Sequence, residues 1–377
     1  MRIALVTPRF APDLGGVETH ARELARRFAD RGMAVEVLTQ TADASRPAEE
    51  EWDGFLVRRF PVVFASDNYA VSWRLPLFLA RERRRYDLIH VHNYHALAAL
   101  GGALCAGDRP VVFTPHYHGV GHSPVRSALH RPYRLAGRLL FRRSGRVICV
   151  SHAEARLVAR HFPEIAAKIE VIPNGVDTAD LTVAEPFDVG EHVVLSVGRL
   201  ERYKNLDAVI DAMSELDETY VLRIVGEGPD GERLRRRSGA LGIRSRVGFL
   251  GRLDRATLCR WYRTASVYVN VSSQEAFGIG ALEALAGGAM VVLSDIPAHR
   301  EVVERYAKER GRLVSEPRSP ARLAESIAAA AQIGRENAPA VALPTWDAVA
   351  DETAALYVST LRRDPRRGRW TPRPEHG

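Results

Sequence analysis

The chain has 377 residues, of which 46% are hydrophobic and 26% charged, and its formal net charge is +7. This composition is typical of a soluble globular protein with two domains and excludes a largely disordered chain. The cysteines Cys105, Cys149 and Cys259 lie too far apart for a disulfide framework or a zinc ligand set. Because the apolar run at residues 3–7 is also too short for the core of a signal peptide, we expect a cytoplasmic protein.

Short β-branched runs alternate with amphipathic, helix-length segments through the first half of the chain. In one such segment, residues 17–32, apolar positions recur at helical spacing and Gly32 ends the pattern. Alternating strands and helices predict a parallel sheet that helices cover on both faces. The strands predicted in this half are 3–7, 34–39, 87–92, 110–115 and 146–151.

The same pattern restarts after a polar passage that follows the turn dipeptide Asn174-Gly175. The restart predicts an α/β fold of two Rossmann-like, doubly wound domains, at 1–175 and 176–345. A final amphipathic helix at about 346–361 precedes a basic, proline-rich tail, 362–377, which we expect to be disordered. The strands predicted in the second half are 192–198, 219–226, 246–251, 266–272 and 290–294.

Ligands of open parallel sheets bind beyond the carboxyl ends of the strands, so the loops that follow strands are candidate sites. After the first strand, Gly15-Gly16 precedes a helix whose N-terminal amides could approach an anion. After the first strand of the second half, Arg199 offers a planar fork and Lys204 a point charge for a diphosphate. A plain loop with a helix cap and a pair of solvated surface cations are the alternative interpretations.

Gly226, Gly228 and Gly231 satisfy the spacing G-x-G-x-x-G after a strand. The dinucleotide-binding fingerprint also needs an acid about 20 residues further on, at a strand end, and no acid stands there. We therefore interpret the motif as a strand-to-helix turn whose backbone could border a nucleotide.

Glu275 and Glu283 lie on either side of a segment that is poor in large side chains. A helix is expected to begin near Gly278 or Ile279, which places Glu283 about one turn into it. The backbone amides of Phe277, Gly278 and Ile279 can then reach a bound group. Two carboxylates, which only accept hydrogen bonds, suit the hydroxyl groups of a sugar or a ribose.

The stretch 276–293 has a single charge over a length that approaches that of a bilayer span. Its glycines and the apolar run that closes it favour a loop, a helix and a buried strand instead.

The segment EAFGIGALEALAGG, which begins at Glu275, resembles the E-x7-E motif of the GT4-type (group 1) retaining glycosyltransferases, which have the two-domain GT-B fold. The resemblance spans nearly the whole chain and includes GGVE, VIPNGVD, GRLERYKN, VGEGP, FLGRL and TWDAVA. It implies an N-terminal acceptor domain, a C-terminal nucleotide-sugar donor domain, a cleft between them, and a final helix that packs back on the first domain.

The resemblance also implies roles for the candidate donor-binding residues. Arg199 and Lys204 would hold the donor diphosphate, and Gly16 would close over the phosphate from the first domain. Glu275 would contact hydroxyl groups of the donor sugar, and Glu283 would contact the nucleotide ribose.

His116, in TPHYHG, matches the histidine that the family places beside the donor sugar, so His116 and Glu275 are the predicted catalytic residues. Because His118 follows closely, which histidine faces the donor stays open, and a histidine that only packs is the alternative. The family mechanism is front-face, retaining transfer in which the leaving phosphate helps to deprotonate the acceptor, with no cofactor and no essential metal. No D-x-D metal motif lies near these loops.

The implied activity is transfer of a hexose-type sugar from a nucleotide sugar, such as a UDP- or GDP-sugar, to a hydroxyl acceptor. A GT-B sugar-nucleotide epimerase, a glycan phosphorylase and a non-catalytic nucleotide-sugar binding protein are the alternatives.

Residues 123–146 contain seven arginines and no acid. No nucleic-acid-binding motif accompanies them, so we do not expect a nucleic-acid partner. A solvated helix face is one interpretation. The other is contact with an anionic membrane surface, the inner face of the cell membrane, where a lipid-linked acceptor would be found.

Overall fold

The computed structural model describes residues 1–362 apart from 14, 67–68, 120–123, 190–191 and 334–340, and apart from the side chains of 65, 66, 69 and 124–132. The chain divides into two compact units. The first consists of Met1–Asn174 and the segment that starts at Trp346, and the second is Gly175–Thr345. These limits lie within one residue of the predicted domain limits.

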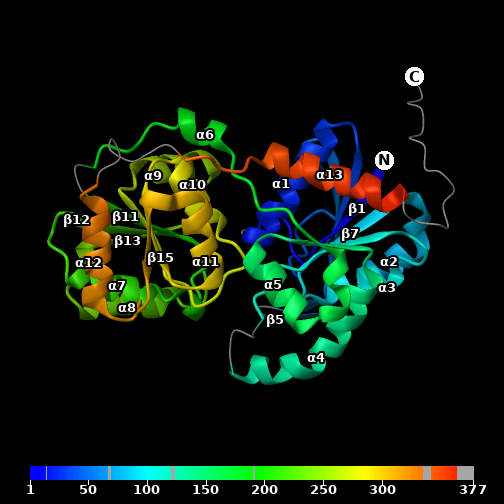
Figure 1. Cartoon of the computed structure of the whole chain (residues 1–377), viewed down its shortest axis with the longest axis horizontal. Helices are drawn as coiled ribbons and strands as arrows, with labels where there is room; N and C mark the ends of the chain where they lie inside the picture. Colours follow the sequence, from blue (N-terminus) through cyan, green and yellow to red (C-terminus); the bar gives the residue numbers. More distant parts are fainter. Residues whose placement is uncertain (14, 67–68, 120–123, 190–191, 334–340, 363–377) are drawn as a thin grey trace. The chain divides into compact units, whose positions relative to one another are not determined.

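The first unit is built on an eight-stranded sheet with the order β10-β9-β8-β7-β1-β2-β4-β3 (Figure 1). All neighbouring strands are parallel except the edge pair β3 and β4, and β5 and β6 form a separate small hairpin. The strands are Arg2–Val6 (β1), Ala34–Thr41 (β2), Glu49–Trp52 (β3), Phe55–Pro61 (β4), Phe64–Ser66 (β5), Tyr69–Val71 (β6), Leu88–His92 (β7), Val111–Thr114 (β8), Arg146–Cys149 (β9) and Ile169–Val171 (β10). The helices are Gly16–Asp30 (α1), Arg74–Glu82 (α2), Leu97–Cys105 (α3), Pro124–Arg143 (α4), His152–His161 (α5) and Trp346–Arg362 (α13).

The second unit is built on a six-stranded, wholly parallel sheet with the order β13-β12-β11-β14-β15-β16. Its strands are His192–Val197 (β11), Tyr220–Val225 (β12), Val247–Gly251 (β13), Val267–Asn270 (β14), Met290–Ser294 (β15) and Gly311–Val314 (β16). Its helices are Thr178–Val183 (α6), Leu206–Ser214 (α7), Gly231–Ala240 (α8), Arg255–Thr264 (α9), Ile279–Ala286 (α10), Pro297–Val302 (α11) and Pro320–Ala331 (α12).

The strand order reverses once near the middle of each main sheet. In the first unit β1 lies between β2 and β7, and in the second β11 lies between β12 and β14. Loops that leave the carboxyl ends of such a strand pair run to opposite faces of the sheet, and the crevice between them is the usual ligand site of a doubly wound fold. The two candidate sites are therefore beside β1/β7 and beside β11/β14.

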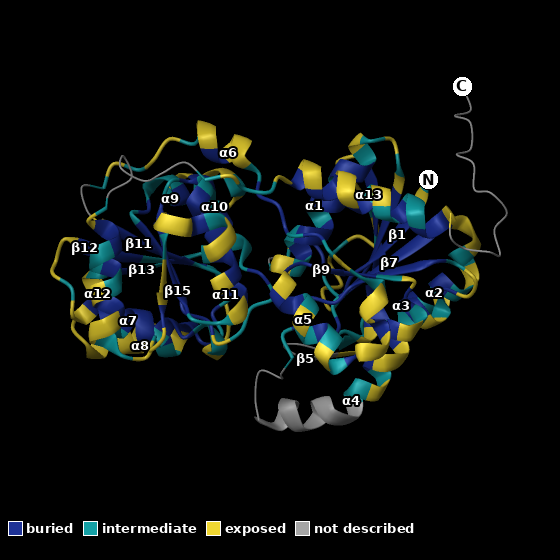
Figure 2. Cartoon of the chain, viewed as in Figure 1, coloured by how far each residue is buried: buried dark blue, intermediate teal, exposed yellow. Residues whose placement is uncertain are grey.

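Helices cover both faces of the sheets, so the central strands are buried along their whole length (Figure 2). All five residues of β7 and all five of β15 are buried, which explains why their sequences are mainly apolar, with His90 and His92 as the polar residues of β7.

Helix α13 belongs to the first unit, where it packs along α1 (Figure 1). Arg31, which directly follows α1, donates to Asp351 at 2.7 Å, and the Tyr357 hydroxyl lies 2.6 Å from Nδ1 of His90 on β7. The final helix is thus grouped with the first unit, the domain on which it was expected to pack.

The ten predicted strands and the two predicted helices at 17–32 and 346–361 all occur, with ends that differ by one or two residues. Residues 276–293 form a loop, α10 and β15, as predicted. Among the described residues, no helix is both long and apolar enough to cross a membrane. The tail after residue 362 lies outside the described residues.

Six strands were not predicted: β3, β4, β5, β6, β10 and β16. They are short or lie toward sheet edges, where one face is solvated. In β3 and β4 the sequence EEEWDGFLVRRF carries so many charges that apolar periodicity is weak, although its Asp-Gly pair is a hairpin signal.

Candidate active site

A buried ion pair occupies the carboxyl ends of β11 and β14. Lys204 Nζ lies 2.5 Å from Glu275 Oε1, and both side chains are less than a fifth exposed. The carboxylate also accepts hydrogen bonds from Asn270 at 3.2 Å and from the Ser272 hydroxyl at 3.1 Å. Lys204 and Glu275 are 71 positions apart in the sequence but lie in direct contact. The sequence analysis expected them to bind neighbouring groups of one donor.

The pair is charged at neutral pH. Burial by itself would raise the pKa of Glu275, but Lys204, with help from His299 and Asn270, lowers it to about 2. Burial would likewise lower the pKa of Lys204, but the Glu275 carboxylate raises it above its ordinary value. A fixed cation and a fixed carboxylate thus stand side by side, the former suited to phosphate oxygens and the latter to sugar hydroxyls.

Backbone hydrogen bonds join the two loops that carry this pair. Asn205, in a left-handed conformation with φ of 51°, donates from its side chain to the Val271 carbonyl at 2.8 Å. The Ser273 amide donates to the Tyr203 carbonyl at 2.8 Å. Because asparagine tolerates positive φ better than most residues, Asn205 can hold Lys204 against the neighbouring loop.

The glycines of the G-x-G-x-x-G motif allow a second loop to approach the first. A Cβ atom on Gly226 would lie 2.1 Å from the Gly198 carbonyl oxygen, and one on Gly228 would lie 2.4 Å from the Leu200 carbonyl oxygen. The Leu200 amide donates to the Glu227 carbonyl at 2.9 Å. The motif therefore positions the loop that carries Arg199, in agreement with its interpretation as a strand-to-helix turn.

Helix α10 begins at Ile279, after Gly278 in a left-handed conformation with φ of 114°. The helix lies close to two tyrosines: a Cβ on Gly280 would stand 2.5 Å from the Tyr268 hydroxyl, and one on Gly287 would stand 2.7 Å from the Tyr262 carbonyl. This close packing explains the lack of side chains between Glu275 and Glu283. It leaves the first amides of the helix available to an anion, since those groups have no acceptor inside the helix.

Glu283 is held from α9. Its carboxylate accepts hydrogen bonds from the Arg255 guanidinium and from the Tyr262 hydroxyl, the latter at 2.8 Å. Arg255 and Tyr262 are seven residues apart and therefore lie on one face of α9. Sequence reasoning did not select them, although this seven-residue spacing in RATLCRWYRT was a usable signal.

His299 is a further residue that the sequence analysis missed. It is fully buried, its Nδ1 lies 3.0 Å from the Ser294 hydroxyl, and its imidazole edge is near Gly278. Burial lowers the pKa of His299 to about 4, against the opposing influence of Glu275, so the ring is neutral at pH 7. Its only sequence signal was a histidine that follows the strand end Ser294-Asp295.

The remaining predicted residues divide between the units. Arg199 is bonded to Glu201, two positions away, while Phe277 is buried and Ile279 is partly exposed at the start of α10. Gly16 and His116 lie in the first unit, Gly16 as the first residue of α1.

His116 follows β8 and is buried, with a φ of 48° that is unusual for a residue with a side chain. Such backbone strain is concentrated at functional sites. His20 of α1 and His92 of β7 lie beside it, with ring centroids 5.2 and 6.1 Å from that of His116. Burial lowers the pKa of all three, that of His20 to about 4, so the cluster is neutral at pH 7.

The architecture is that of the GT-B class: two doubly wound parallel-sheet units, with polar residues gathered at the strand reversal of each. Comparison with known proteins agrees. Residues 14–180 match the family described as Glycosyltransferase Family 4, and residues 178–338 match Glycosyl transferases group 1.

One relative supports the same family, and two solved structures share the fold. D-inositol 3-phosphate glycosyltransferase 1 of Catenulispora acidiphila is 30% identical over 353 residues, which cover 84% of this chain and 82% of that one. Sucrose-phosphate synthase of Thermosynechococcus elongatus has a TM-score of 0.75 at 23% identity, with 94% of this chain and 98% of that one covered. HepE of Anabaena, in complex with UDP and glucose, has a TM-score of 0.73 at 22% identity, with 96% and 98% covered. The chain belongs to the GT4-type, group 1 glycosyltransferases and is a transferase enzyme.

Proposed function

We propose that this enzyme transfers a hexose from a nucleotide-diphosphate sugar to a hydroxyl acceptor, with retention of the anomeric configuration and without a cofactor or an essential metal. The observation that carries the proposal is the Lys204–Glu275 pair at the strand reversal of the second unit. It places a phosphate-binding cation next to a carboxylate that can accept from sugar hydroxyls. The neighbouring α10 N-terminus adds amide donors.

In the proposed step the bond from the anomeric carbon to the diphosphate breaks, and a bond from that carbon to the acceptor oxygen forms on the same face. The acceptor proton passes to the departing phosphate oxygen. Lys204, Arg199 and the amides at the start of α10 stabilise the negative charge that develops on the diphosphate, which is the main catalytic contribution of the protein. Glu275 orients the sugar, and His116 is the other proposed catalytic residue.

The proposed donor is a UDP- or GDP-sugar. UDP is favoured because a structure of similar fold, HepE, holds UDP with glucose. The test is calorimetric titration of the purified protein, with EDTA present, against UDP, GDP, ADP and their common sugar conjugates. Tight binding of one nucleotide sugar supports the proposal, and NMR of the product anomer tests retention. No binding by any of them would contradict it.

We propose further that the acceptor is carried by the inner face of the cell membrane, as a lipid-linked glycan or a glycolipid. Eight of the eleven large apolar side chains exposed among the described residues belong to the part of the first unit between residues 63 and 139. Helix α3 contacts both α2 and α4, so the apolar side chains on these helices lie on neighbouring elements. The eight are Val63, Phe64, Trp73, Leu77, Leu97, Leu104, Leu135 and Leu139.

Cations accompany this apolar surface. Arg74, Arg81 and Arg84 are exposed on and after α2, and Arg138 and Arg142 are exposed on α4. Helix α4 contains no acidic residue. A mixture of apolar side chains and arginines is typical of a surface that binds anionic lipid. The first half of the 123–146 stretch lies outside the described side chains.

Co-sedimentation with vesicles tests this surface. Wild-type protein should bind vesicles that contain anionic lipid and not neutral ones, and Leu139→Glu should weaken that binding. Val183→Glu changes an even more exposed apolar residue, which lies in the second unit, and should have no effect. Equal binding to neutral and anionic vesicles, or none to either, would contradict the proposal.

A further inference from the structure

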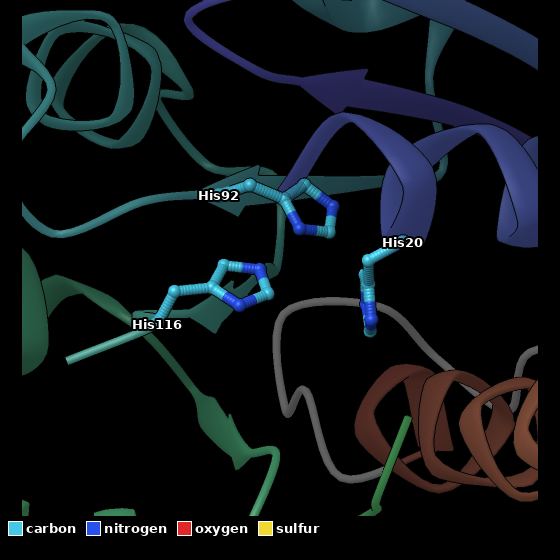
Figure 3. Close-up of side chains that lie close together, drawn as sticks. All are labelled: His20, His92 and His116. Carbon is cyan, nitrogen blue, oxygen red and sulfur yellow. The ribbon is translucent and has the colours of Figure 1, made fainter. Parts of the chain in front are cut away.

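Three buried histidines of the first unit come together from three separate elements (Figure 3). His20 is on α1, His92 ends β7, and His116 follows β8, so the rings meet beside the strand reversal at β1 and β7. One ring nitrogen from each histidine lies within 4.8 Å of the other two. Their exposed fractions are 1%, 0% and 9%.

Four ring nitrogens of this cluster have no hydrogen-bond partner among the described residues. These four buried atoms are Nε2 of His20, Nε2 of His116 and both ring nitrogens of His92. A buried polar atom without a partner costs about 1–3 kcal/mol, and most buried polar side-chain atoms in proteins are satisfied. Four such atoms in one place are available to a ligand that interacts with imidazole nitrogens. The nearby His90, by contrast, is satisfied at both nitrogens, by Tyr357 and Thr114.

A partner outside the cluster fixes one of the rings. Nδ1 of His20 lies 2.6 Å from Oδ1 of the buried Asn174 and donates its proton to that oxygen. Nε2 of His20 then carries the lone pair of the ring. Histidines that bind metals commonly donate the other ring N–H to a carbonyl or carboxylate oxygen in this way.

We propose that His20, His92 and His116 form a binding site for a first-row transition-metal ion, with Zn²⁺ as the preferred ion. Three imidazole nitrogens suit zinc, whereas Mg²⁺ and Ca²⁺ require oxygen ligands, which this cluster lacks. A tetrahedral ion with Zn–N distances of about 2.0–2.1 Å needs its ligands about 3.4 Å apart. The ligand atoms, which lie within 4.8 Å of one another, would have to approach by at most about 1.4 Å, and rotation about χ2 can supply this because that torsion is broad. The fourth position is left for water.

The proposed metal would be a regulator and not a participant in the transfer. It would take a lone pair of His116, the residue proposed to lie beside the donor sugar, so bound Zn²⁺ should inhibit the transferase. This consequence depends on the proposed function, whereas metal binding itself does not.

The test uses untagged, full-length protein that has been stripped with a chelator and dialysed. Calorimetric titration with Zn²⁺ should show one site per chain, and Co²⁺ in its place should give the intense visible bands of a tetrahedral ion. His20→Gln and His92→Gln should each weaken Zn²⁺ binding by at least about 100-fold, and Asn174→Ala by about 10- to 100-fold. His192→Gln, which removes an exposed histidine of the second unit, is the matched control and should bind as wild type does.

Thermal unfolding of each variant shows whether it is folded, and Asn174→Ala provides a test if a histidine variant is not. The proposal is overturned if the wild type does not bind zinc. It is also overturned if zinc binds equally to the wild type, His20→Gln and Asn174→Ala. Water would then be the partner of the cluster. UDP titration of the same samples reports the proposed function separately, because the donor-binding residues Lys204 and Glu275 are not changed.

Discussion

Replacement of Lys204, but not of Glu275, should weaken the binding of UDP without a sugar. If Lys204 holds the diphosphate, Lys204→Ala removes a charged hydrogen bond worth about 1.5–3 kcal/mol, which corresponds to about 10- to 140-fold weaker binding. Glu275→Gln removes the carboxylate that holds Lys204 at 2.5 Å in the free protein. Lys204 no longer has to leave a charged partner, so UDP should bind equally well or up to about tenfold more tightly.

The nucleotide sugar should distinguish the two variants further. Glu275→Gln should reduce turnover of the sugar conjugate, because the neutral amide is a weaker acceptor for sugar hydroxyls. The matched control is Arg202→Ala, which removes the same charge from an exposed side chain two positions from Lys204.

The assay is calorimetry with UDP and with the nucleotide sugar, with thermal unfolding to confirm that each variant is folded. Wild-type UDP affinity in Lys204→Ala, or equal loss of UDP affinity in Glu275→Gln, would refute the assignment of the cation to the diphosphate and of the carboxylate to the sugar.

Three other predictions concern the second unit. If Glu283 contacts the ribose, Glu283→Gln should weaken nucleotide binding by about 1.5–3 kcal/mol. Gln is preferable to Ala, because Ala would remove the acceptor of the Tyr262 hydroxyl. Unchanged nucleotide affinity in calorimetry would show that Glu283 is not part of the site. Gly228→Ala should lower both the urea midpoint of unfolding and the affinity for UDP, since its Cβ would stand 2.4 Å from a carbonyl oxygen. The control is Gly239→Ala, whose Cβ would have nothing within 4 Å and which should raise the free energy of unfolding by roughly 0.5 kcal/mol. His299, with a pKa of about 4 in the folded chain and 6.5 when unfolded, stays neutral as the unfolded chain gains a proton. The contribution of His299 to the free energy of unfolding is therefore complete above pH 6.5 and is lost as the pH falls toward 4, with a loss of about 2 kcal/mol at pH 5. In urea unfolding, His299→Gln should lose less of its free energy of unfolding over this pH range than the wild type does. An identical pH profile in the two proteins would count against this role of His299.

Local sequence determined most of the secondary structure and the position of the candidate loops. Central parallel strands are buried on both faces, so β7 and β15 are readable as apolar runs, and the turn residues after them mark the loops. The E-x7-E spacing located both ends of α10 because Gly278 and Gly287 flank it. Edge strands such as β3 gave no such signal, because a strand solvated on one face and rich in charge has little apolar periodicity.

Partners distant in the sequence could not be read from it. The sequence selected Glu275 and Lys204 as separate ligands, but only the strand order, which places β14 beside β11, brings them into one ion pair. Glu283 is held by Arg255 and Tyr262 from another helix, and the glycines after β12 are needed because a neighbouring loop passes within contact distance.

The histidine cluster shows the same limit in the first unit. Of these three histidines, only His116 was a candidate site residue in the sequence analysis, since a lone histidine on a strand or an amphipathic helix has many roles. Their convergence depends on the packing of α1 across the ends of β7 and β8. The sequence thus determined the chain's class, its two domains and the residue types available for chemistry. The tertiary structure alone decided which of those residues share a site, because contact between residues 70 or more positions apart is set by strand order and helix packing and not by local spacing.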